Sequence, residues 1–272
     1  MTERFPKSAP ATEPPDDLLG RSAPGRFSDK MRDQNHWLRR LPIAHRGLHD
    51  EAAGIIENSL SAFAAARDSG YAVELDLRLS RDGEAIVFHD ETLDRLTAQT
   101  GSVESYSAKQ LGAMGLRGST DQIPSLSAVL RLVARQVPLL LELKRCAAAP
   151  GTLETRVADL LAGYMGPVAI QSFDPAIVTW FQTHTPTIPR GLLASAERDL
   201  LTPAMVAAQF IAYDVRALPA LGPAFARGIG RPVIAWTVRD PQTWSIAAQH
   251  ADNIIFEGIH PEIPGKHVTG RA

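Results

Sequence analysis

The sequence is poor in cysteine and has little excess charge of either sign. Its 272 residues contain one cysteine, Cys146, so an internal disulfide is excluded. This cysteine content is compatible with a reducing compartment. We expect Cys146 to be a small buried packing residue and not a nucleophile, because no other feature of the sequence indicates a catalytic role for it. The formal net charge is −2, which gives no electrostatic reason to expect nucleic acid or an anionic membrane as a partner.

Long apolar runs, a secretory signal and a glycine-rich phosphate turn are also absent. No run approaches the roughly 18 apolar residues that cross a bilayer, so we expect no stable membrane insertion. The N-terminus lacks the apolar core of a secretory signal, and the expected location is cytoplasmic. No G-x-G-x-x-G or Walker pattern is present, which argues against the alternative of a doubly wound open sheet.

Two regions of different composition divide the chain. Residues 1–36 carry scattered prolines among Ser, Ala, Asp and Arg without a sustained apolar period, and we predict a flexible N-terminal arm there. Trp37 and Leu38 are candidates for anchoring the end of this arm. The chain is 44% hydrophobic and 21% charged, so residues 37–272 are predicted to form a single domain with one substantial core.

Short, nearly continuous apolar runs recur along that domain, and they give way to polar or aromatic residues at their C-terminal ends. Such runs are typical of strands that are buried on both faces. Strands are predicted near residues 42–45, 72–78, 138–143, 167–172, 189–193, 210–214, 232–237 and 252–256. Helices are predicted near residues 57–69, 125–136, 152–163, 174–183, 202–208, 219–228 and 240–249. This alternation predicts an α/β fold, a (β/α)8 TIM barrel, which binds ligands at the C-terminal ends of its strands.

An antiparallel hairpin is predicted directly after the second strand, with residues 84–89 returning. The second strand alternates apolar and polar residues, so Glu74, Asp76 and Arg78 share one face. Asp82-Gly83 is a strong signal for a tight reversal. A parallel crossover would need about a dozen connecting residues, which this segment does not have. Counting outward from the turn places Asp76 roughly opposite His89.

The carboxylates of Glu74 and Asp76, beside His89, form a candidate site for a divalent metal with an acid or base partner. Taken alone, acidic residues on a strand face are more often a solvated surface. Several predicted strands end in polar residues at the same edge of the sheet, and this convergence favours a shared site.

Five short motifs together resemble the motif series of the glycerophosphodiester phosphodiesterases. They are Ala44-His45-Arg46-Gly47, Glu57-Asn58-Ser59, Glu74-x-Asp76, His89-Asp90 and Glu142-x-Lys144. The resemblance extends over about residues 42–264. It implies a catalytic barrel related to phosphatidylinositol-specific phospholipase C, with one bound divalent cation, that hydrolyses glycerophosphodiesters to sn-glycerol 3-phosphate and an alcohol.

By the same resemblance, Glu74, Asp76 and Glu142 would be the metal ligands. Three carboxylates suit a hard cation, Mg²⁺ or Ca²⁺, and no Cys/His cluster suggests zinc. His45 and His89 would be the general acid and general base, because an imidazole titrates near neutral pH. We expect the remaining histidines to lie at the surface: His36, His49, His184, His250, His260 and His267.

Four further residues are candidates for substrate binding. Arg46 and Lys144 would neutralise phosphate oxygens, although Lys144 is about as well explained by an ion pair with Glu142. Asn58 would support the site by hydrogen bonding, and a helix cap is an equally good explanation. Trp236 would form an apolar wall for the glycerol or the leaving group.

The sequence departs from the family pattern at its last strand, where Glu257 stands near the position at which relatives usually carry Thr-Asp. Glu257 is a candidate substitute for that carboxylate. Two alternative functions stay open. One is an enzyme of the lysophospholipase D or phospholipase C type that acts on lipid phosphodiesters. The other is a phosphate-binding barrel without catalysis.

Overall fold

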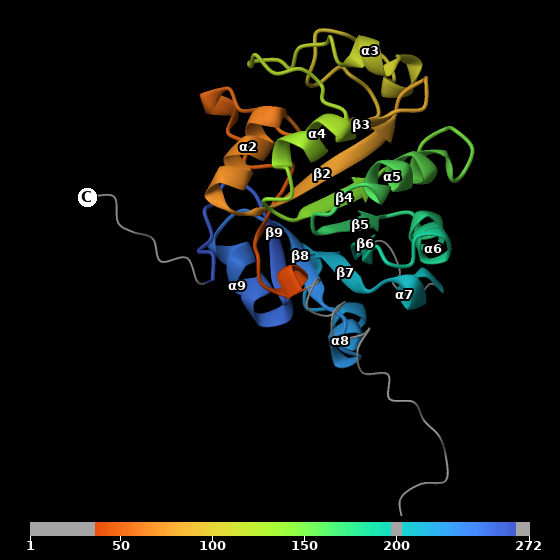
Figure 1. The fold of residues 1–272 in the computed structure, drawn as a ribbon. Coiled ribbons are helices and arrows are strands. Elements are labelled where there is room, and N and C mark those ends of the chain that lie inside the picture. Colours follow the sequence, from red (N-terminus) through yellow and green to blue (C-terminus); the bar gives the residue numbers. More distant parts are fainter. Residues whose placement is uncertain (1–35, 197–202, 265–272) are drawn as a thin grey trace, which may run out of the picture. The chain divides into compact units, whose positions relative to one another are not determined.

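The computed structural model describes residues 36–196 and 203–264 (Figure 1). The arm predicted over residues 1–36 lies outside this part except for His36, so the domain boundary stays a prediction. The described chain begins with a short 3-10 helix, η1 (His36–Arg39), in which Trp37 and Leu38 are buried. The Asn253 side chain donates to the carbonyls of both residues. The predicted anchoring by Trp37 and Leu38 is therefore confirmed.

Eight parallel strands form a closed barrel, as predicted. They are β1 (Ile43–Ala44), β2 (Ala72–Leu79), β4 (Leu139–Leu143), β5 (Val168–Ser172), β6 (Arg190–Ala194), β7 (Phe210–Asp214), β8 (Val233–Val238) and β9 (Asn253–Phe256). The two-residue strand β1 pairs with β2 on one side and with β9 on the other, and this closes the ring.

Helices follow the strands and pack on the outside of the barrel (Figure 1). They are α2 (Leu60–Ser69), α4 (Leu126–Val133), α5 (Thr152–Ala162), α6 (Pro175–His184), α7 (Pro203–Ala207), α8 (Leu221–Gly228) and α9 (Pro241–His250). Ser59 caps the start of α2 and Asp240 caps the start of α9, as expected for residues whose side-chain oxygens accept free N–H groups. Within the described ranges, none of these helices is long and apolar enough to span a bilayer.

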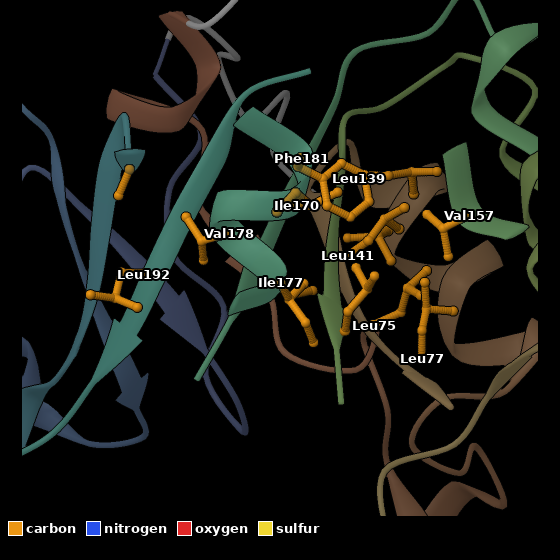
Figure 2. Close-up of a cluster of buried hydrophobic side chains, with 14 of the residues drawn as sticks. Leu75, Leu77, Leu139, Leu141, Val157, Ile170, Ile177, Val178, Phe181 and Leu192 are labelled. Carbon is orange, nitrogen blue, oxygen red and sulfur yellow. The ribbon is translucent and has the colours of Figure 1, made fainter. Parts of the chain in front are cut away.

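The period of two along each strand divides the core into an outer and an inner layer. Outward-facing residues such as Leu75, Leu141 and Ile170 pack against Val157 and Phe181 of the surrounding helices (Figure 2). A separate inner layer fills the barrel itself and consists of Ile43, Ala72, Leu140, Ala169, Phe210, Ile234 and Ile255. Gly191 makes room for one of these residues, because a Cβ there would overlap the ring of Phe210.

The hairpin after β2 is present, but its register differs from the prediction by one residue. The returning strand β3 (Ala85–Val87) is antiparallel, and Val87 lies opposite Leu77. Phe88, and not His89, therefore faces Asp76 and donates its backbone N–H to the Asp76 carbonyl at 3.0 Å. The reason is a three-residue turn centred on Asp82 and closed between Ser80 and Glu84; the prediction had centred it between Asp82 and Gly83.

Between β3 and α4 the chain forms an excursion with its own small core, which contains η3 (Val103–Ser105) and α3 (Ala108–Leu111). Its buried side chains include Phe88, Leu93, Leu111 and Ile123. The excursion lies beyond β3, at the top of the view in Figure 1. Cys146 lies just after β4 and is half-buried, so its predicted burial is only partial.

Candidate active site

A cavity of about 230 Å³ opens at the C-terminal ends of the strands. Every site residue nominated from the sequence lines it except Asp76 and Asn58, which are buried and hydrogen-bonded to each other. The position of the cavity follows from the inner apolar layer. Two residues beyond that layer, on the same strand faces, stand His45, Glu74, Glu142, Gln171, Trp236 and Glu257. Because inward-facing residues recur at every second position, the polar residues form the next layer toward the C-terminal ends of the strands, adjacent to the apolar layer.

Three buried carboxylates meet at one side of this cavity. Glu74 and Asp76 are two residues apart on β2, and Glu142 of β4 is the register partner of Asp76. One oxygen from each of the three lies within 4.8 Å of the others. The set consists of oxygen donors alone, which is the chemistry that Mg²⁺ and Ca²⁺ prefer.

The pKa values of these carboxylates are shifted by burial and by the neighbouring charges. Burial, with the charges of Asp76 and Glu142, raises the pKa of Glu74 well above its ordinary value. Burial likewise raises the pKa of Glu142 to about 6, whereas Lys144 and Arg46 outweigh burial and lower the pKa of Asp76. One oxygen of Glu74, Oε1, is buried and has no hydrogen-bond partner among the described residues. A cation would satisfy this oxygen and relieve the repulsion, so the residues present fit a divalent ion.

Lys144 and Arg46 supply the positive charge next to the carboxylates. The Lys144 Nζ lies 2.8 Å from Asp76 Oδ1 and also donates to Glu142, so the ion pair weighed from the sequence is present. The Arg46 backbone N–H donates to Glu74 at 2.9 Å, and its guanidinium donates to Glu57 at 2.8 Å. Both cations line the cavity as well, so their charge is available to a bound anion.

Asn58 holds Asp76 and does not cap a helix. Its side-chain N–H donates to Asp76 Oδ2 at 2.8 Å, and its carbonyl oxygen accepts the Asp76 backbone N–H at 3.2 Å. The helix cap belongs to Ser59 instead, which accepts from the N–H of Ala62. Of the two explanations that the sequence left open for Asn58, the helix cap is therefore not the one used, and support of the site stays a prediction.

His45 is oriented by a carboxylate from the opposite end of the domain. Its Nδ1 lies 2.9 Å from Glu257 Oε2, which also accepts from Arg239 Nη2 at 2.9 Å. The bond from His45, with the one from Arg239, lowers the pKa of Glu257 to about 2 in spite of burial. Glu257, whose role the sequence left in doubt, is therefore an ionised partner of His45.

His89 has a similar arrangement built from local residues. Its Nδ1 lies 2.7 Å from Asp90 Oδ1, and Arg95 donates to both oxygens of Asp90 at 2.6 and 3.0 Å. Burial raises the pKa of Asp90, but the bonds from Arg95 and His89 outweigh it and bring the value to about 2. Burial is also the largest influence on both imidazoles, and it lowers the pKa of His45 and of His89.

Trp236 of β8 lines the cavity, and its role as a wall for the substrate stays a prediction. Its ring meets that of Phe173 edge to face, with centroids 5.6 Å apart. None of the other histidines within the described ranges lines the cavity, and His267 lies outside those ranges.

Sequence reasoning did not nominate several residues that line the same cavity, among them Gln171, Asp214, Arg216 and Arg239. The signal for Gln171 was available, because it lies near the end of the predicted strand 167–172 as Glu142 lies near the end of 138–143, and the two are register partners. Arg216 lies in the short 3-10 helix η4 (Val215–Ala217) and Arg239 follows β8, and the strand pattern gives no signal at either place.

Comparison with known proteins agrees with this geometry. Residues 45–256 match the Glycerophosphoryl diester phosphodiesterase family. The putative glycerophosphodiester phosphodiesterase YhdW of Bacillus subtilis is 28% identical over 81% of this chain and 99% of its own length.

Solved structures show the same fold. A phosphodiesterase of Oleispira antarctica in complex with the product sn-glycerol-3-phosphate has a TM-score of 0.71 and is 22% identical, covering 79% of this chain and 93% of its own. A putative glycerophosphoryl diester phosphodiesterase from Silicibacter pomeroyi has a TM-score of 0.71 and is 23% identical, covering 82% and 93%. The family match spans most of the chain and includes both histidines and all three clustered carboxylates, so the chain belongs to the glycerophosphoryl diester phosphodiesterase family.

Proposed function

We propose that this enzyme hydrolyses glycerophosphodiesters to sn-glycerol 3-phosphate and an alcohol, with His45 and His89 as acid and base. The observation that carries the proposal is that both imidazoles open onto the one cavity that also holds the carboxylate cluster. Family membership supports the reaction class, and the Oleispira relative contains the expected product. Arg46 and Lys144 would contribute positive charge to the scissile phosphate from the same cavity wall.

Glu74, Asp76 and Glu142 would hold one divalent cation, Mg²⁺ or Ca²⁺. When bound, the ion would offset phosphate charge and make a nearby hydroxyl more acidic. Asn58 and Lys144 keep Asp76 in position through its two oxygens, which is the kind of support that metal ligands need.

The histidines are arranged for proton transfer in both directions. Because Glu257 and Asp90 each engage an Nδ1, the Nε2 atoms are left to face the substrate. The lowered pKa of each ring keeps it able to accept a proton near neutral pH. One ring would take a proton from the nucleophile while the other gives a proton to the departing alcohol oxygen.

Two routes fit this arrangement. In the first, the glycerol 2-hydroxyl attacks phosphorus, the bond from phosphorus to the alcohol breaks, and water then opens the cyclic phosphate with the histidine roles reversed. In the second, water attacks phosphorus directly. A 2-deoxy analogue separates them, because full turnover of that analogue would exclude the cyclic route.

The proposal is tested by measuring glycerol 3-phosphate release from several glycerophosphodiesters with and without a chelator. We expect activity that a chelator removes and that added Mg²⁺ or Ca²⁺ restores. Glu74→Gln should abolish the dependence on metal while the thermal unfolding midpoint stays near that of the wild type. Unchanged activity in Glu74→Gln would contradict the ligand assignment.

Lipid-directed activity is measured in the same experiment by comparing glycerophosphocholine with lysophosphatidylcholine as substrates. Preferential turnover of lysophosphatidylcholine would replace the proposed substrate class by a lipid one. The single catalytic domain over residues 37–272 and the cytoplasmic location belong to the same proposal. Expression of residues 37–272 alone and cell fractionation are their respective tests.

A further inference from the structure

Arg78 is a cation in the site region that the proposed chemistry does not use. It follows Asp76 by two residues on β2 and so projects from the same strand face, one step closer to the outer end of the barrel. Its Nε donates to the backbone carbonyl of His89 at 2.8 Å. This bond fixes the guanidinium beside the catalytic hairpin and leaves both Nη nitrogens for another acceptor.

The Arg78 guanidinium also differs from its neighbours in having no close counter-charge. Among the described residues, no carboxylate oxygen lies within 4.0 Å of it. Asp76, Glu91, Glu104 and Asp90 attract it only from a longer range. The Arg46 guanidinium, by contrast, lies 2.8 Å from Glu57 Oε1 and 3.2 Å from Asp76 Oδ2. A half-buried guanidinium without a paired anion is unfavourable, so a ligand anion is its natural partner.

A second cavity lies in front of Arg78. It measures about 390 Å³ and shares Glu142, Lys144 and Phe173 with the catalytic cavity, so the two adjoin at the metal-binding side. Its remaining walls come mainly from the ends of β4 and β5 and include Arg145 and Asp174. A substrate whose phosphate sits beside the carboxylate cluster can therefore extend into this space.

The charges around the second cavity do not cancel. Lys144 is paired with Glu142, and the Arg145 side chain, 87% exposed, lies 4.0 Å from Asp174. Among the described residues that line this cavity, Arg78 is left as the one cation without an ion pair. The glycerol part of a glycerophosphodiester is uncharged, so it offers this guanidinium no counter-charge.

We propose that the second cavity binds the leaving alcohol and that Arg78 selects alcohols that carry an anionic group. The inference rests on the proposed function. It names the substrate class as glycerophosphodiesters whose alcohol bears a phosphate or carboxylate. In the reaction water is added, the bond from phosphorus to the alcohol oxygen breaks, and that oxygen receives a proton. The anionic group stays on the alcohol throughout.

The test uses three diesters of glycerol phosphate whose leaving alcohols are ethanol, 2-phosphoethanol and choline. We expect the wild-type enzyme to favour 2-phosphoethanol over ethanol by about tenfold or more in kcat/KM, and choline to be the poorest. Arg78→Gln should reduce turnover of the 2-phosphoethanol diester about 10- to 100-fold. Turnover of the ethanol diester should stay within about threefold, and Arg78→Lys should restore part of the preference.

Arg131→Gln is the matched control, because it removes an exposed arginine from α4, away from both cavities; its preference should equal that of the wild type. Arg145→Glu provides a second variant at an exposed side chain. It should weaken the preference about threefold and does not disturb the bond to His89.

An equal loss on all three diesters in Arg78→Gln would overturn the inference, because Arg78 would then act on the scissile phosphate or only hold His89. A wild type that cleaves the ethanol diester without preferring 2-phosphoethanol would overturn it while leaving the proposed function intact. A wild type inactive on all three would remove the proposed function and the inference with it.

Discussion

The supports of the two site histidines have the same chemistry but come from different parts of the molecule. Each imidazole contacts a carboxylate through Nδ1, and each carboxylate accepts from an arginine. For His45 the carboxylate is Glu257, 212 positions away, and the arginine is Arg239. For His89 the carboxylate is the adjacent residue, and the arginine follows five positions after it. One support depends on closure of the barrel and the other on a local loop.

The arginines differ most. Arg95 donates twice to Asp90 and also twice to Glu57, which in turn accepts from Arg46. It is therefore part of a network that reaches the carboxylate cluster. Arg239 makes one bond to Glu257, has a side chain that is 54% exposed and lines the cavity. Similar chemistry thus produces a support with more hydrogen bonds at His89 and one with fewer, at the cavity wall, at His45.

The largest expected effect distinguishes acid from base. His45→Gln and His89→Gln should each lower kcat on alkyl diesters by about 10²- to 10⁴-fold. We expect His89 to protonate the leaving alcohol, because its carbonyl holds Arg78 at the second cavity. With p-nitrophenol as the leaving group, which needs no proton, His89→Gln should recover most activity and His45→Gln should not. The reverse pattern would exchange the two roles.

Removing the supporting carboxylates should have the next largest effect. Glu257→Gln and Asp90→Asn should each lower kcat about 10- to 100-fold with little change in KM, because the rings lose their orientation while substrate contacts remain. The measurement is steady-state kinetics on one diester. Ser107→Ala, which removes the side-chain cap of α3 in the excursion after β3, is a control for loss of stability without loss of orientation. A KM effect as large as the kcat effect would mean that these carboxylates contact substrate.

Replacing each supporting arginine by glutamine tests whether the support of His89 is more rigid than that of His45. Arg95→Gln should lower kcat about tenfold, since it releases both Asp90 and Glu57. Arg239→Gln should lower kcat about two- to threefold, since it removes a single bond that a half-exposed side chain makes. Rate measurements on both variants at low and high salt are the check. Equal losses would show that the difference in bonding has no functional consequence.

The smallest effect is on stability. The pKa of Glu257 is lowered to about 2 from its ordinary value of 4.5. The ionised form therefore stabilises the fold above about pH 4.5, and this contribution is lost as the pH falls through about 2. Glu257→Gln should lower the free energy of unfolding by roughly 1–2 kcal/mol at pH 7. The difference from the wild type, measured by urea unfolding, should shrink between pH 4.5 and 2 and should not grow.

The fold and much of the site could be predicted from periodicity and motif. The i, i+2 spacing of Glu74 and Asp76 predicted that they share one face, and the family resemblance added Glu142, which lies beside them. The turn residues announced the hairpin but not its register, because a three-residue turn and a two-residue turn share the same Asp-Gly signal.

What the sequence could not provide are contacts between distant segments. The partner of His45 is decided by where β9 ends, and no local pattern links His45 with Glu257. The sequence predicted that Arg78 lies on the strand face. Whether a carboxylate pairs with it depends on all the elements that pack around it, and the sequence does not give that packing. Asn58 shows the same limit at short range, since Asn58 and Ser59 are both good caps and only the fold shows which one is used.

The strand β1 closes the ring between β2 and β9, and the two ends of the chain contribute different groups to the site. Every proposed ligand and proton donor stands before position 145, whereas the later strands contribute the wall, the floor of the second cavity and the anchor of His45. The first 145 residues thus carry the groups proposed for the reaction and also Arg78, the proposed selector of the alcohol. Divergence after this point can reshape the cavity walls without disturbing the groups that break the bond.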